Sequence, residues 1–234
     1  MNASGCGVFE RRARPLLGTF VDVGVRSGAS GAAPIEEAFA EIGALQRLLS
    51  RFDAASDIAR FNALPAGASL LPSAATLEVL LAAQTLLAAS AGLFDISCGT
   101  APDGWACHDG LLHKVHPRTR LDLGGIGKGY AVDRAVLRMI EHGATAGWVN
   151  AGGDLRVFGD VELPIALRDE SNGGSRPFAG LRDGAFATSH HGGTHVSVAA
   201  PLCLWADALT KVVALSGDTA HPLLARHGAL AWLH

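Results

Sequence analysis

Alternating apolar and polar positions predict a series of short strands along the chain. Residues 19–26 (TFVDVGVR) place valine at every second position, which is the period of a half-buried strand. Shorter apolar runs predict further strands at 120–123 (RLDL), 147–159, 163–169, 195–201 and 229–234.

Four other segments repeat their apolar residues at helical spacing. Helices are predicted over 34–52, 73–91, 128–143 and 203–217. The first begins with Pro34 and two glutamates, which suit the N-terminal end of a helix. The second is apolar enough to raise the question of a membrane span, but Glu78 and Gln84 lie inside it, which favours a buried helix.

The order of these elements indicates the fold class. Helices and strands do not alternate regularly, which favours an α+β fold over a doubly wound sheet. The sequence shows neither an internal repeat nor an interdomain linker, so we predict one domain over residues 1–234, with residues 1–14 as a flexible N-terminal tail.

Composition and charge narrow the function classes. The 234 residues are 49% hydrophobic and carry a formal net charge of -3, and no basic run offers a footprint for nucleic acid. The cysteines at 6, 98, 107 and 203 form no C-x-x-C pair, which disfavours a zinc knuckle or a disulfide framework. Residues 3–6 (ASGC) look like a lipoprotein cleavage box but lack the rest of a signal peptide, so a cytoplasmic location is predicted.

The motif LDLGGIGKGYAVDRA, residues 121–135, surrounds Lys128 with glycines. It fits neither a P-loop, because Asp122 stands at the first glycine position, nor a dinucleotide fingerprint, because Tyr130 stands at the last one. A glycine-rich turn that opens a helix still offers backbone N–H groups and a positive dipole end to an anion. The alternative is that the glycines only permit a tight turn.

A second glycine segment, NAGGD at 150–154, directly follows a predicted strand. A strand bulge would explain it. Alternatively, this segment and the glycine motif at 121–135 both let a ligand come close to the backbone, and the two together suit one shared ligand.

Taken together, these blocks resemble the ApbE family, the FAD:protein FMN transferases. The glycine motif is similar to the family's D-L-G-G-I-A-K-G-Y-A-V-D turn, and NAGGD is similar to its N-x-G-G-D segment. Blocks similar to other family motifs follow the family's order: RPLLGTFVDV, LLSRFDAASDIARFN, SAGLFDISCG, FATS and ADALTKVVALSG. The resemblance extends over most of the chain and implies mixed or antiparallel sheets with packed helices.

The resemblance also implies an activity and its ligands. Such enzymes use Mg²⁺ to split FAD and join its FMN phosphate to a threonine or serine of a target flavoprotein, with release of AMP. Many act at the cell envelope, which is the alternative location. The implied cofactor-binding residues are Leu17, Phe52, Leu93, Phe94, Asp95, Gly124, Lys128 and Tyr130. The implied metal ligands are the Gly127 carbonyl, Asp207 and Thr210.

Two of these residues also have structural interpretations. Phe52 suits the core as well as a stacking surface, and Asp95 suits a cap of the following turn. No catalytic side chain is implied beyond Asp207 acting through the metal.

The chain departs from the family pattern near the phosphate site that the resemblance implies. Lys211 stands where a threonine usually follows the aspartate by four positions; Thr210 shares a helix face with Asp207, and Lys211 is itself a candidate ion-pair partner of that carboxylate. Gly127 replaces a common alanine, which a carbonyl ligand tolerates.

The family's H-[IL]-[IV]-D-P-x-[TS]-G motif is absent, because HHGGTH runs directly into VSVAAP. Among the histidines at 190, 191 and 195, His195 is retained as a candidate acid-base group, against the alternative of a solvated turn. The alternatives to a transferase are a catalytically impaired FAD-binding protein and an FAD pyrophosphatase that yields FMN and AMP.

Overall fold

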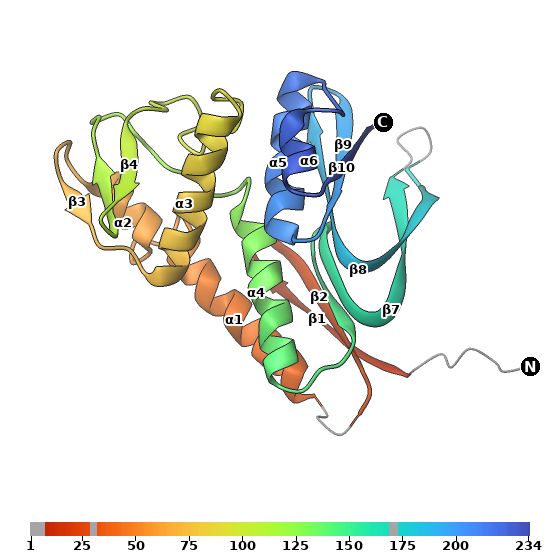
Figure 1. Ribbon diagram of the computed structural model, residues 1–234. Helices are drawn as coiled ribbons and strands as arrows, with labels where there is room; N and C mark the ends of the chain where they lie inside the picture. Colours follow the sequence, from red (N-terminus) through yellow and green to blue (C-terminus); the bar gives the residue numbers. More distant parts are fainter. Residues whose placement is uncertain (1–7, 29–31, 169–172) are drawn as a thin grey trace, which may run out of the picture.

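The computed structural model describes residues 8–28, 32–168 and 173–234, and it has the predicted α+β architecture (Figure 1). The described strands form a seven-stranded sheet, in the order β1-β2-β6-β7-β8-β9-β10, and a three-stranded sheet, β3-β5-β4, with antiparallel pairing between the neighbouring strands. The strands are β1 (Phe9–Leu16), β2 (Thr19–Arg26), β3 (Ser69–Leu70), β4 (Trp105–His108), β5 (Leu111–Lys114), β6 (Gly147–Ala151), β7 (Asp154–Arg168), β8 (Ser175–His191), β9 (Thr194–Ala200) and β10 (Leu230–Leu233). The helices are α1 (Ala33–Leu49), α2 (Asp57–Ala63), α3 (Ala74–Ala89), α4 (Gly127–Glu141), α5 (Cys203–Ser216) and α6 (Pro222–Arg226).

Helices α1, α4 and α5 cover one face of the seven-stranded sheet, while the three-stranded sheet, α2 and α3 lie to the other side of α4 (Figure 1). The alternating valines of β2 are fully or almost fully buried beneath these helices. A second, smaller apolar cluster occupies the opposite face of the sheet and includes Trp148 and Phe186. Gly24 makes room for the Trp148 ring, since a Cβ at this position would lie 2.1 Å from it.

Helices α4 and α5 cross closely, and hydrogen bonds from one helix to the other hold the crossing together. A Cβ at Gly129 would lie 2.3 Å from the backbone oxygen of Cys203, so only glycine fits here. The Asp133 carboxylate accepts hydrogen bonds from the backbone N–H groups of Cys203 and Leu204, both at 2.9 Å, and pairs with Arg156. Asp133 on α4 therefore caps the first turn of α5, for which Leu202 supplies no side-chain cap.

Three predictions of secondary structure were wrong. Residues 120–123 do not form a strand, because the Asn62 side chain, rather than a neighbouring strand, binds the backbone N–H and C=O of Leu121. Residues 9–14 are not a tail but part of β1, which pairs with β2 along its full length. Residues 147–159 are not one strand, since the chain turns at 152–153 between β6 and β7.

The four predicted helices are confirmed as α1, α3, α4 and α5. Helix α3 begins after Ser73, whose hydroxyl accepts from the backbone N–H of Thr76. Within the described residues, no helix has the length and hydrophobicity needed to span a membrane. Cys6 and most of the predicted tail that precedes β1 lie outside the described residues.

Candidate functional site

A cavity of about 410 Å³ lies where the β1–β2 turn, the end of α1 and the glycine turn before α4 meet. Five residues predicted for the site come together in its wall: Leu17, Phe52, Gly124, Gly127 and Lys128. The remaining lining residues are Gly18, Gln46, Leu49, Ser50, Arg51, Asp122 and Leu123.

The β1–β2 turn places Leu17 in this wall in a strained conformation. Leu17 and Gly18 have φ angles of 56° and 72°, which is the geometry of a two-residue hairpin turn and is costly for leucine. The Gln46 side chain on α1 holds the turn, because its Oε1 accepts from the Leu17 N–H at 2.6 Å. Strain of this kind concentrates at ligand sites.

Phe52 is an exposed aromatic surface at the cavity. Its side chain is 82% exposed, so the core interpretation of this residue is wrong. The guanidinium of Arg51 lies 4.3 Å from the centre of its ring, and Arg51 is itself held by Asp122, with 3.0 Å between Nε and Oδ2. A fixed, exposed ring of this kind offers a face on which a planar ligand can stack.

The glycine turn opens α4 toward the cavity without a cap from its own N-terminal residue. Helix α4 begins at Gly127 after Ile126, which makes no side-chain capping bond. The N–H of Gly129 is instead bound by Oδ2 of Asp207, at 3.1 Å. Gly124, Gly127 and Lys128 line the cavity at this helix start, where partial positive charge attracts anions.

Four charged groups form a cluster behind the glycine turn. The Lys128 ammonium is paired with Asp154, and the Lys211 ammonium is paired with Asp207, one helical turn earlier on α5. Both carboxylates are buried. Burial lowers the pKa of Lys128, but the attraction of Asp207 and Asp154 outweighs this effect, so the net shift is upward. Lys128 is therefore cationic at neutral pH.

Asp154 is expected to make stability depend on pH. Burial and the repulsion of Asp207 raise its pKa to about 6, despite the opposing effect of Lys128. Because this folded-state value lies above the unfolded value of about 3.9, ionisation of Asp154 opposes folding above about pH 6, and this penalty is relieved as the pH falls toward about 4.

The free energy of unfolding of Asp154→Asn, minus that of the wild type, should therefore be higher at about pH 7.5 than at about pH 4.5, by roughly 2 kcal/mol. Urea denaturation of both proteins at the two pH values measures this difference. An identical pH dependence in the two proteins would contradict the assignment.

A family model described as the ApbE family matches residues 17–114 and 104–192. The chain belongs to the ApbE family. No curated protein matches it. Among solved structures, it is similar to the apo form of the flavinyl transferase ApbE of Pseudomonas stutzeri, with 22% identity, a TM-score of 0.83, and coverage of 97% of this chain and 91% of that one.

Two further solved structures of this kind share the fold. The flavin transferase ApbE of Vibrio cholerae has 18% identity and a TM-score of 0.86, with coverage of 97% of this chain and 93% of that one. The ApbE protein of Thermotoga maritima has 20% identity and a TM-score of 0.85, with coverage of 97% and 94%. The ApbE fold is thus present almost in full.

Asp207 and Thr210, two of the three metal ligands that the ApbE resemblance implies, do not fit a divalent cation in this chain, because other groups of the chain already bind their oxygen atoms. Oδ1 of Asp207 holds the Lys211 ammonium, and Oδ2 holds the Gly129 N–H. The Thr210 hydroxyl donates to the backbone oxygen of Asp207 at 2.6 Å and accepts from the Ser189 hydroxyl at 2.5 Å. Across the described ranges, no three His, Cys, Asp or Glu residues are grouped to hold a metal ion.

Four residues implied by the ApbE resemblance lie elsewhere. Leu93 borders a separate hollow beside α6, and Phe94 is buried in the main core. The Asp95 carboxylate accepts hydrogen bonds from the turn that follows it, which is its structural alternative. The Tyr130 hydroxyl donates to Glu78 on α3 at 2.6 Å, and burial, together with this bond, raises its pKa.

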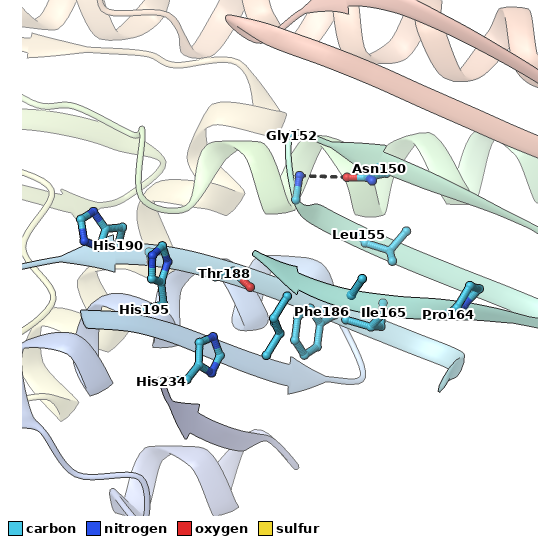
Figure 2. A pocket seen from close by; sticks show the side chains of 14 residues that line it. Asn150, Gly152, Leu155, Pro164, Ile165, Phe186, Thr188, His190, His195 and His234 are labelled. Carbon is cyan, nitrogen blue, oxygen red and sulfur yellow. Dashed lines mark hydrogen bonds between the residues drawn. The ribbon is translucent and has the colours of Figure 1, made fainter. Parts of the chain in front are cut away.

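His195 lies in a second hollow, of about 430 Å³, on the sheet face away from the helices (Figure 2). Phe186 belongs to the smaller apolar cluster, whereas the alanines on either side of it belong to the main core. Strand alternation therefore places His190 on the Phe186 face, and its cross-strand partner His195 stacks on it with ring centres 4.6 Å apart. The structure does not bring His195 to the wall that holds Lys128.

Sequence reasoning missed three residues that shape the site. Gln46 fixes the β1–β2 turn, the Ser189 hydroxyl donates a hydrogen bond to the Thr210 hydroxyl, and Asp154 pairs with Lys128. Asp154 and Ser189 had a signal in the sequence, as the last residues of the NAGGD and FATS segments, whereas Gln46 had none.

Proposed function

We propose that this chain is a flavin transferase that binds FAD at the 410 Å³ cavity and passes FMN to a hydroxyl of an acceptor flavoprotein. Membership of the ApbE family and the fold shared with the flavin transferases of Vibrio cholerae and Pseudomonas stutzeri support this function. The single observation that carries it is the cavity itself, where an exposed aromatic ring lies near a cationic helix N-terminus.

The lining residues suit the two chemical parts of FAD. Phe52 and Leu17 offer apolar surface to a flavin or adenine ring. The start of α4 and Lys128 offer positive charge to the pyrophosphate. In the reaction, an acceptor hydroxyl oxygen bonds to the FMN phosphorus, the bond from that phosphorus to the bridging oxygen breaks, and AMP and the hydroxyl proton are released. Phosphoryl chemistry of this kind depends mainly on positioning and charge stabilisation.

The proposed reaction at this cavity does not use a magnesium ion. The Asp207 carboxylate that the ApbE resemblance assigns to the ion is already neutralised by Lys211. We therefore propose that lysines of the chain, rather than a metal ion, stabilise the negative charge on the leaving phosphate.

The test is product analysis after incubation of the purified protein with FAD and a threonine-bearing acceptor protein. A transferase releases AMP and leaves the acceptor flavin-labelled, as seen by chromatography and by in-gel fluorescence. Release of AMP and FMN in equal free amounts without labelling would indicate a pyrophosphatase instead. Absence of AMP release with every acceptor tried would remove the catalytic claim.

A specific observation favours one alternative, an FAD-binding protein without turnover. The β8–β9 hairpin closes at residues 192–193, directly after His191, so the H-[IL]-[IV]-D-P-x-[TS]-G segment has no counterpart there. That protein would retain FAD through purification and leave it intact.

A further inference from the structure

We propose that Lys211 acts as a built-in cation at the phosphate end of the site, so that the chain binds FAD without a divalent metal ion. The inference rests on the proposed FAD site and specifies how its negative charge is balanced. It concerns the Asp207 carboxylate, where Lys211 stands in place of the threonine that the resemblance implies.

The first support is the way in which Lys211 holds Asp207. Its Nζ donates to Oδ1 of the carboxylate, and also to the backbone oxygen of Asp207 at 3.0 Å. The carboxylate is fully buried, and its second oxygen accepts the Gly129 N–H. Both oxygens are therefore occupied by groups of the chain, and a divalent ion would have to displace the ammonium to bind.

The second support is the position of the Lys211 stem. A Cβ at Gly125 would lie 3.4 Å from Cε of Lys211, so this side chain lies against the glycine turn. Gly124 and Gly127, on either side of Gly125 in the sequence, line the cavity. The Lys211 side chain is 31% exposed. The stem of Lys211 thus packs against the turn that borders the cavity, and its ammonium is bound to the buried carboxylate.

The third support is the charge balance of the cluster. Lys128 and Lys211 face Asp154 and Asp207, and these four groups sum to zero. Mg²⁺ is usually bound by one or two carboxylates together with substrate phosphates, and both carboxylates of this cluster are already paired with an ammonium. The chain contains only three lysines, and two of them are in this cluster.

The decisive comparison is FAD affinity in EDTA and in excess MgCl₂, measured by calorimetry on the full chain. The wild type should bind FAD equally in both. Lys211→Thr should bind about tenfold more weakly in EDTA, the effect of losing one charged contact, and should recover in MgCl₂ because Asp207 is then free to bind the ion.

Arg182→Thr is the matched control. It removes the same charge from an exposed residue of β8, and it should bind FAD like the wild type in both buffers. Weaker binding by this variant in EDTA, with recovery in MgCl₂, would overturn the inference, since net charge rather than Lys211 would then set the metal requirement.

A second readout needs no FAD. Mn²⁺ titrated into the protein and followed by electron paramagnetic resonance should show no site in the wild type. It should show one site in Lys211→Thr, and this site should disappear in Lys211→Thr/Asp207→Asn. The wild-type measurements test the inference even where a variant fails to fold.

The outcomes separate this inference from the proposed function. If the wild type binds FAD only in MgCl₂, or takes up Mn²⁺ at a site that Asp207→Asn removes, the built-in cation is wrong while the FAD site stands. If the wild type binds FAD in neither buffer, the proposed function falls, and this inference falls with it.

Discussion

Gly129→Ala is expected to destabilise the fold by about 3 kcal/mol or more, the upper end of the range for overpacking a core. The added Cβ would lie 2.3 Å from the backbone oxygen of Cys203, 2.7 Å from its carbonyl carbon and 2.9 Å from Cβ of Asp207. These are backbone or buried atoms that cannot move aside. Helices α4 and α5 would have to separate, which would also stretch the hydrogen bonds from Asp133 to the first turn of α5.

Gly127→Ala, two residues earlier on the same helix, provides the control for this prediction. Its Cβ would meet only Leu123 at 3.5 Å and Leu49 at 3.8 Å, which are ordinary contacts. Since alanine favours a helix over glycine by up to about 1 kcal/mol, this variant should be as stable as the wild type or slightly more so. Urea denaturation followed by circular dichroism compares them. Equal midpoints for the two variants would show that α4 and α5 do not cross this closely.

The elements that the sequence predicts well are those whose burial is periodic. Helix α4 buries a continuous apolar stripe, and β2 buries alternate residues, so each pattern identified its element. Strand β8 was missed because its first half is mostly exposed and contains Pro177 and Gly180. The segment 120–123 was wrongly assigned because its partner is the Asn62 side chain, which no local pattern reveals.

In the candidate site, too, the sequence predicted the residues that lie in local motifs but not those whose positions depend on distant packing. The turn residues Leu17, Gly124 and Lys128 lie in motifs with conformational demands, and the structure brings them together. The position of His195 depends on which face of the sheet each residue of its hairpin points to, and packing against distant elements decides this. Ser189 points toward α5, and His190 points to the opposite face. The Lys211–Asp207 pair was one of two open alternatives in the sequence, and only the structure shows the ammonium in place.

Lys128→Met is expected to weaken FAD binding by about 10- to 100-fold, the usual range for one charged hydrogen bond to phosphate. Lys128 lies in the cavity wall at the start of α4 and carries its charge there through neutral pH. Methionine keeps most of the side-chain volume, so the change removes charge rather than packing. Equilibrium titration of FAD into both proteins, in EDTA, measures the loss, and undiminished affinity would place the pyrophosphate elsewhere.

A weaker complex alone would not identify the cause, because Lys128 also neutralises Asp154. Without the ammonium, the buried Asp154 carboxylate would face the phosphates directly, and repulsion from it would mimic a lost contact. Lys128→Met/Asp154→Asn separates the two effects. If Lys128 binds phosphate, the double variant stays weak; if it only neutralises Asp154, affinity returns to the wild-type value. A return would leave Lys211 as the lysine that contacts the pyrophosphate.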